Sequence, residues 1–401
     1  MVPRRYRLYR RPAIVRRGAG SLVINHPAPV ICGDTDQHLL PGNWQGIDAW
    51  VTASAVTTRP AIDNAFWHGM MQTNTSRDRE GMLMSQSPAY VPHGVIPAVL
   101  LPFDNDLAID EQNFRKHLRD VAATPGISAI TVNAHSTEVA SCTFDEQRRV
   151  LDIARNEIGS RMPVVNGIWA DGSLEAAKLA RMATQGGASA LLVFPPGPFT
   201  LGQSAEMALA HFKRIADATD LPLIAFQYPL STGQGYPKDT LLRMCEEVPQ
   251  IRAIKDWIGH VPHHEWHVRT LQHLPHPVNV LTTHSAWLLS SLVLGCNGLL
   301  SGSGSVIADL QARLFRAVQN NDLAEARRLN DRIDPLARCF YADPFVDMHN
   351  RMKEALVLLG RLPRAVVRPP LVKLNTGEVT RIRQALISSG LLDERARSSA
   401  A

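Results

Sequence analysis

The chain has 401 residues, 45% of them hydrophobic and 20% charged, with a net charge of +5. This apolar fraction can build a sizeable core, which excludes a wholly disordered, collagen-like or low-complexity chain. No apolar run approaches the roughly 18 residues that a membrane span needs, so we expect no membrane partner. The five cysteines show no CxxC spacing. They predict reduced thiols in a cytoplasmic protein, with neither a disulfide framework nor a zinc site.

The positive charge is concentrated at the N-terminus. Residues 1–83 hold ten Arg, no Lys and six acidic residues, which gives +4 of the total +5. A basic arm and a transit peptide are alternatives, but we expect residues 1–93 to be a disordered or mis-started extension, with Met82 or Met84 as the alternative start. Because the main body is nearly neutral, we expect no nucleic-acid partner. Binding through the Arg-rich arm is the alternative.

Short apolar runs alternate with amphipathic stretches from residue 95 onward. Near-continuous Val, Ile, Leu and Ala is typical of parallel strands that are covered on both faces. Eight such strands are predicted at 95–101, 128–134, 163–168, 189–194, 222–228, 251–257, 278–283 and 297–302. Eight helices are predicted between and after them at 110–123, 144–158, 173–185, 204–218, 238–248, 261–273, 285–295 and 307–319.

Eight strand–helix units within about 225 residues predict a (β/α)₈ TIM barrel over residues 94–320. A doubly wound open sheet is the competing fold. It usually carries a glycine-rich phosphate loop after its first strand, and the segment PFDNDLAID (102–110) contains no glycine. Three more helical patterns predict a C-terminal helical appendix, residues 321–395, packed on the barrel.

One lysine lies in an unusual position. Six of the seven lysines fall in predicted helices or loops, whereas Lys255 lies near the C-terminal end of the apolar strand 251–257. In a barrel the C-terminal strand ends form the active face. Burial lowers the pKa of an amine, and a neutral amine can attack a carbonyl carbon to form a Schiff base. The alternative is a lysine at the strand exit that reaches solvent or pairs with Asp256.

Several short motifs occur in a specific order around this lysine. They are NAHSTE (133–138), FPPGPF (194–199), FQYPLSTG (226–233), AIKDWIG (253–259) and GCNGLLSGSG (295–304). Together they resemble the dihydrodipicolinate synthase / N-acetylneuraminate lyase family over residues 94–390. The resemblance implies a class I, Schiff-base (β/α)₈ enzyme that acts on pyruvate or another 2-oxo acid. It also implies a homotetramer or homodimer, and a Schiff base needs no further cofactor because the iminium is itself the electron sink.

The resemblance assigns roles to individual residues. Lys255 matches the family's Schiff-base lysine. Ser136 takes the place of a threonine whose hydroxyl holds the substrate carboxylate, and Thr137 is expected to add a backbone N–H. Leu300 matches a position whose backbone carbonyl faces the substrate. Glu138 is retained from the family pattern, and we expect it to have a structural role.

The chain differs from the family at the positions of the residues that relay protons. Phe226 occupies the usual position of the catalytic tyrosine and cannot relay a proton. Tyr228 lies two residues further on, and hence on the same strand face. His135 replaces the first threonine of the family motif and can act as acid, base or hydrogen-bond donor. Either residue is a candidate to replace the tyrosine, and a packed structural role is the alternative for each.

A second group of departures concerns the synthase's own substrate. Pro196 and Gly197 replace its paired tyrosines, and Ser231 replaces the arginine that binds a second carboxylate. We therefore predict a Schiff-base lyase, aldolase or hydro-lyase. The alternatives are 4-hydroxy-tetrahydrodipicolinate synthase proper and a catalytically silent homologue that binds a 2-oxo acid.

The remaining histidines of interest are five. His284 follows the seventh strand and is a candidate to contact the distal end of the substrate, with a loop histidine that has no role as the alternative. His260, His263, His264 and His267 occur at helical spacing in the segment HVPHHEWH (260–267). HHEWH does not match HExxH, so we predict a solvated helix face and no metal site.

Overall fold

The computed structural model describes residues 90–393. The extension predicted over residues 1–93 lies almost entirely outside them. Within the described part of the chain, none of the helices has the length and apolar character that crossing a membrane requires.

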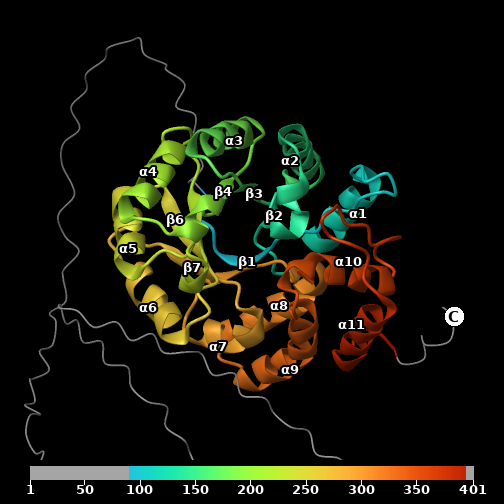
Figure 1. Cartoon of the computed structure of the whole chain (residues 1–401). Helices are drawn as coiled ribbons and strands as arrows, with labels where there is room; N and C mark the ends of the chain where they lie inside the picture. The colour runs from blue at the N-terminus through green and yellow to red at the C-terminus, as the bar shows by residue number, and fades with distance from the viewer. Residues whose placement is uncertain (1–89, 394–401) are drawn as a thin grey trace, which may run out of the picture. The chain divides into compact units, whose positions relative to one another are not determined.

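Eight parallel strands form one sheet in the order β1-β8-β7-β6-β5-β4-β3-β2. The strands are β1 (Gly94–Pro97), β2 (Ile130–Val132), β3 (Val164–Ile168), β4 (Ala190–Val193), β5 (Leu223–Gln227), β6 (Ile251–Asp256), β7 (Asn279–Thr282) and β8 (Gly298–Ser301). Parallel bridges from Val95 to Ile127 and from Ala98 to Thr131 join the two ends of this order, so the sheet closes into a barrel (Figure 1). The predicted TIM barrel is confirmed, and the doubly wound sheet is excluded.

Helices follow the strands and surround the barrel (Figure 1). They are α1 (Glu111–Ala122), α2 (Phe144–Ile158), α3 (Ser173–Gln185), α4 (Ala205–Ala216), α5 (Lys238–Glu247), α6 (Val261–Leu271), α7 (Leu288–Val293) and α8 (Gly304–Gln319). Some of them start at a side chain that accepts a backbone N–H group, as at Asp110, Thr143 and Ser204. The predicted helix at 285–295 is shorter than expected, because a 3-10 turn, Ser285–Trp287, precedes α7.

Three further helices follow the barrel, as predicted: α9 (Leu323–Phe340), α10 (Met348–Leu358) and α11 (Thr376–Ser388). Helix α10 is almost completely buried. Its Lys353 forms an ion pair with Glu138 in the loop after β2, and Glu138 also accepts the backbone N–H of Arg368 at 3.1 Å. Glu138 therefore has the structural role expected from the sequence, and it connects the C-terminal segment to the loop that carries His135 and Ser136.

Side chains alternate between two apolar layers along each strand. One layer fills the barrel interior, and the other lies between the barrel and the helices. On β6, Ala253 belongs to the inner layer and Ile254 to the outer one. Because strand side chains alternate, Lys255 then points into the barrel and Asp256 points outward toward α6. The two polar side chains at the end of β6 thus lie on opposite faces of the strand, one inside the barrel and one between the barrel and α6.

Candidate active site

Lys255 lies inside the mouth of the barrel, where it is only 5% exposed. It lines a cavity of about 260 Å³ at the C-terminal strand ends, together with Ser136, Phe226 and His284. The Nζ atom lies 4.0 Å from the centre of the Phe226 ring, on the neighbouring strand β5. This geometry excludes the alternative that Lys255 reaches solvent or pairs with Asp256.

The environment of Lys255 favours a neutral amine. Burial lowers the pKa of Lys255 to about 7. An ammonium group loses its hydration inside the barrel. The cation–π contact with the face of Phe226 compensates only a small part of the lost hydration free energy. A large fraction of the molecules therefore carries a nucleophilic amine near neutral pH.

His135 and Tyr228 form a hydrogen-bonded pair beside this cavity. The Tyr228 hydroxyl lies 2.8 Å from His135 Nε2. Burial, helped by the nearby charge of Lys255, holds the pKa of His135 well below its usual range. Burial also raises the pKa of Tyr228. Both groups are thus neutral, and the tyrosine hydroxyl can donate to the imidazole. The two candidates that the sequence offered separately are one unit in the structure.

Ser136 presents a hydroxyl with an unused hydrogen-bonding capacity. It lies in the 3-10 turn His135–Thr137 that follows β2, and it is 1% exposed. Within the described residues its Oγ has no hydrogen-bond partner, although it lines the same cavity as Lys255. A buried polar atom without a partner costs about 1–3 kcal/mol, so its orientation fits a site that a polar ligand completes.

Thr137 does not offer the backbone N–H that was predicted to contact the substrate. The Thr137 N–H donates to the Ala134 carbonyl at 3.0 Å, which closes the 3-10 turn, so it is not free for a carboxylate. Its hydroxyl donates to the Val99 carbonyl at 3.1 Å and accepts the Ala134 N–H at 3.0 Å. The sequence could not reveal that the tight turn uses these groups. The side chain of Leu300 is fully buried in the inner barrel layer, and the substrate contact of its backbone carbonyl stays a prediction.

His284 lines the cavity, but both of its ring nitrogens have partners in the protein. Nε2 accepts the Gly259 N–H at 3.1 Å, and Nδ1 lies 3.2 Å from Thr282 Oγ1. Its ring stacks on Trp287 with the ring centres 3.9 Å apart. Burial lowers the pKa of His284 to about 4. A neutral, fully engaged imidazole shapes the cavity wall and cannot readily donate to a substrate.

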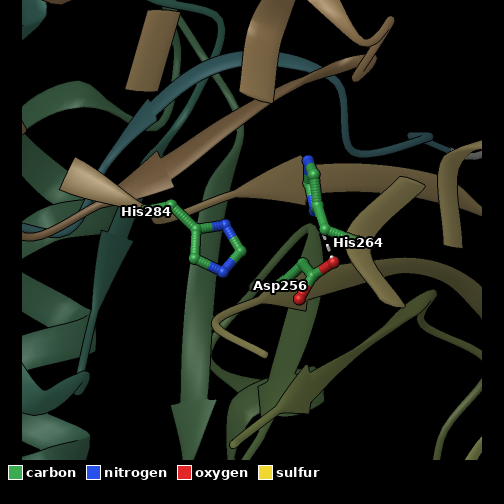
Figure 2. Close-up of side chains that lie close together, drawn as sticks. All are labelled: Asp256, His264 and His284. Atoms are coloured by element: carbon green, nitrogen blue, oxygen red, sulfur yellow. Dashed lines mark hydrogen bonds and ion pairs between the residues drawn. The ribbon is translucent and has the colours of Figure 1, made fainter. Parts of the chain in front are cut away.

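The prediction of a solvated helix face is wrong for two of the four α6 histidines. His260 is exposed and His263 is partly exposed, but His264 and His267 are buried. Their Nδ1 atoms lie 2.8 and 2.7 Å from Asp256 Oδ2, and Figure 2 shows the first of these contacts. The Asp256 carboxylate is buried outside the barrel and needs hydrogen-bond donors there, and His264 and His267 of α6 provide them.

This carboxylate and its imidazoles form an ion-paired cluster. Burial alone would raise the pKa of Asp256, but the two histidines hold it well below its usual range. Burial also disfavours a charge on His264, yet the hydrogen bond to Asp256 raises the pKa of His264 to about 10. Asp256 is therefore negatively charged and His264 positively charged, and the two charges neutralise each other inside the cluster.

Asp256, His264 and His284 also bring ligand-type atoms within 4.8 Å of one another (Figure 2). Each of these atoms is used in a hydrogen bond. Asp256 Oδ1 accepts the Ile258 N–H at 2.9 Å, and His264 Nε2 lies 2.7 Å from Ser291 Oγ. A metal ion would have to displace these bonds, so we describe the group as a hydrogen-bond network.

Several residues that line the cavity were not predicted. Trp257 directly follows the lysine strand, and Tyr341, Phe345, Met348 and His349 come from the C-terminal segment. Trp257 could have been found from its place after Lys255. The four residues of the C-terminal segment reach the site only because α9 and α10 pack against the barrel. No local sequence pattern predicts this packing.

A closed parallel barrel with a lysine-containing cavity at its C-terminal strand ends has the architecture of a TIM-barrel enzyme. The model of the dihydrodipicolinate synthetase family matches residues 91–388, and the chain belongs to this family. The membership predicted from the sequence is confirmed, and with it the prediction of a lyase of the aldolase type.

The relatives match about three quarters of this chain and nearly all of their own length. The 4-hydroxy-tetrahydrodipicolinate synthase of Nitratidesulfovibrio vulgaris is 28% identical over 301 residues, which are 75% of this chain and 99% of the relative. That of Salinibacter ruber is 30% identical over 74% of this chain and 94% of the relative. A solved structure of YagE, a prophage protein of the family from E. coli K12 in complex with pyruvate, matches with a TM-score of 0.69 at 25% identity. This match covers 75% of this chain and 99% of YagE.

Proposed function

We propose that the protein is a Schiff-base lyase or aldolase for pyruvate or a related 2-oxo acid, with Lys255 as the residue that forms the imine. The observation that carries this proposal is the shared cavity of Lys255 and Ser136. It contains an amine whose pKa burial lowers to about 7, and a buried hydroxyl that has no partner in the described residues. The family relationship and the pyruvate complex of YagE support the same substrate class.

The proposed chemistry assigns one task to each group. The neutral Lys255 amine attacks C2 of the 2-oxo acid, and loss of water gives the iminium. The Ser136 hydroxyl donates to the substrate carboxylate. When a 4-hydroxy-2-oxo acid is cleaved, Tyr228 removes the hydroxyl proton while His135 accepts the tyrosine proton. The electron pair of the C3–C4 bond moves to the iminium and leaves an enamine and an aldehyde. Protonation at C3 and addition of water then release pyruvate and restore the amine.

The alternatives receive less support from the site. The synthase proper needs a group for a second carboxylate, and the corresponding position is Ser231, in the 3-10 turn Leu230–Thr232 after β5. A silent homologue needs no proton relay, whereas the 2.8 Å contact between Tyr228 and His135 supplies one. We therefore favour turnover, with an acceptor other than that of the synthase.

Borohydride reduction in the presence of pyruvate tests the proposal. We expect one stable adduct per chain, located by mass spectrometry on the peptide that contains Lys255. The peptide with Lys178, which is exposed on α3, reports nonspecific labelling in the same digest. An intact Lys255 after reduction, or labelling spread evenly over both peptides, would sink the proposal.

The pH dependence of trapping gives a second expected result. Because the pKa of Lys255 is lowered to about 7, the neutral fraction rises as the pH increases through 7 and is nearly complete above 8. We expect the rate of trapping by cyanoborohydride at low pyruvate to fall about ten-fold per pH unit below this value. An ordinary lysine would give a half-maximal rate near pH 10 instead. A rate that still rises steeply between pH 8 and 10 would contradict the buried, neutral amine.

A further inference from the structure

A second cavity adjoins the one that contains Lys255. It has a volume of about 510 Å³. The two cavities share five lining residues, which are His135, Trp257, Phe345, Met348 and His349. Tyr228 also lines the second cavity. The hydrogen-bonded Tyr228–His135 pair therefore stands at the junction, where it can reach a group that extends from one cavity into the other.

The walls of the second cavity are mainly aromatic and aliphatic. Trp169, Trp257 and Phe345 contribute rings, and Val139, Val346, Met348, Pro369, Pro370 and Leu371 contribute aliphatic surface. Trp257 and Phe345 are stacked, with ring centres 5.1 Å apart. Such walls gain free energy by covering an apolar or aromatic group.

The charged side chains at this cavity are already neutralised. Glu138 pairs with Lys353. Arg368 pairs with Glu146 and donates to the carbonyls of Leu107 and Ser141. Burial lowers the pKa of His349 to about 3, so it carries no charge. The cavity walls formed by residues 90–393 thus contain no cation free to bind a second carboxylate, whose burial without a partner is costly.

Resting on the function proposed above, we propose that the second cavity binds the part of the substrate beyond C4, and that this part is an apolar, preferably aromatic group. The substrate class is then a 4-hydroxy-2-oxo acid with an aryl or bulky apolar substituent at C4. Cleavage of the C3–C4 bond gives pyruvate and an aromatic or apolar aldehyde. The C4 hydroxyl loses its proton to the Tyr228–His135 pair and becomes the aldehyde oxygen, and the bonding electrons pass to the iminium on Lys255. C3 regains a proton before water releases pyruvate, so the reaction is redox-neutral.

Competitive trapping tests this substrate class without requiring turnover. Equal concentrations of 2-oxo-4-phenylbutanoate and 2-oxoglutarate are mixed with the protein and reduced with borohydride, and the two adducts on Lys255 are counted by mass spectrometry. Both compounds have the same 2-oxo acid head and differ only in the group attached to C4, a phenyl ring in one and a carboxylate in the other. We expect the phenyl adduct to exceed the other by about ten-fold or more, since burying one ring readily supplies this factor.

A charge at the cavity rim should change this preference. Val346 lines the second cavity and is 60% exposed, so Val346→Arg is compatible with folding. We expect the variant to shift the adduct ratio toward 2-oxoglutarate by about ten-fold. Val293→Arg is the matched control, because Val293 is 53% exposed on α7 and lines neither cavity. It should leave the ratio unchanged.

The outcomes separate the two proposals. If pyruvate is trapped but 2-oxoglutarate equals or exceeds the phenyl compound, the apolar substrate class is wrong and the Schiff-base function stands. Equal shifts in the two valine variants also overturn the assignment of the cavity. If neither pyruvate nor either longer acid is trapped on Lys255, the proposed function itself fails.

Discussion

Replacing Lys255 by Arg is expected to abolish the borohydride adduct and to lower kcat/KM for cleavage by about ten-thousand-fold or more. The arginine side chain has a similar length, but its guanidinium stays protonated and cannot form the imine. Pyruvate release from a 4-hydroxy-2-oxo acid, measured with a coupled assay, gives the rate.

The matched control is Lys178→Arg on the surface of α3, which should retain the full rate and the adduct. A thermal unfolding curve of each variant distinguishes lost chemistry from lost structure. If Lys255→Arg remains folded and keeps cleavage within ten-fold of the parent, Lys255 is not the nucleophile and another group must carry the reaction.

Removal of the Asp256 carboxylate is expected to have the largest effect on stability. Asp256→Ala leaves His264 and His267 buried without the acceptor that lies 2.8 and 2.7 Å from them. Breaking a buried ion pair by removing one partner costs about 3–5 kcal/mol of unfolding free energy. Chemical denaturation measures this loss. Asp256→Asn keeps an acceptor oxygen and should lie between the parent and the alanine variant.

Asp309→Ala is the control for this experiment. Asp309 forms an exposed ion pair with Arg313 on α8, and such pairs contribute about 0–1 kcal/mol. If Asp256→Ala costs no more than this surface variant, the cluster beneath β6 is not an ion-paired network, and the histidines of α6 have a different role.

The barrel was predictable because its signals are local. Each strand is a short apolar run and each helix an amphipathic one, and a lysine inside the run at 251–257 stands out among seven. The position of Lys255 at the strand end follows from the fold alone. The pairing of His135 with Tyr228 was not predictable, since 93 residues separate them and only the closed barrel brings them together.

The incorrect predictions have a common cause. His264 and His267 read as a polar helix face because helical spacing says nothing about the residue on the strand beneath, here Asp256. Thr137 was expected to give its N–H to a substrate, but the 3-10 turn uses that group itself. In both cases a contact outside the local pattern decides the role of the side chain.

The ion pair between Lys353 and Glu138 joins positions 215 residues apart in the sequence. It connects α10, which supplies His349, to the loop that supplies His135 and Ser136. The smallest unit that could carry out the proposed reaction therefore extends beyond the eighth strand–helix repeat. A chimera that took only the barrel from a relative would contain the relative's lysine, but its cavity walls would come from two proteins. Substrate selectivity in this chain therefore has to be engineered in the barrel loops and in the C-terminal helices together.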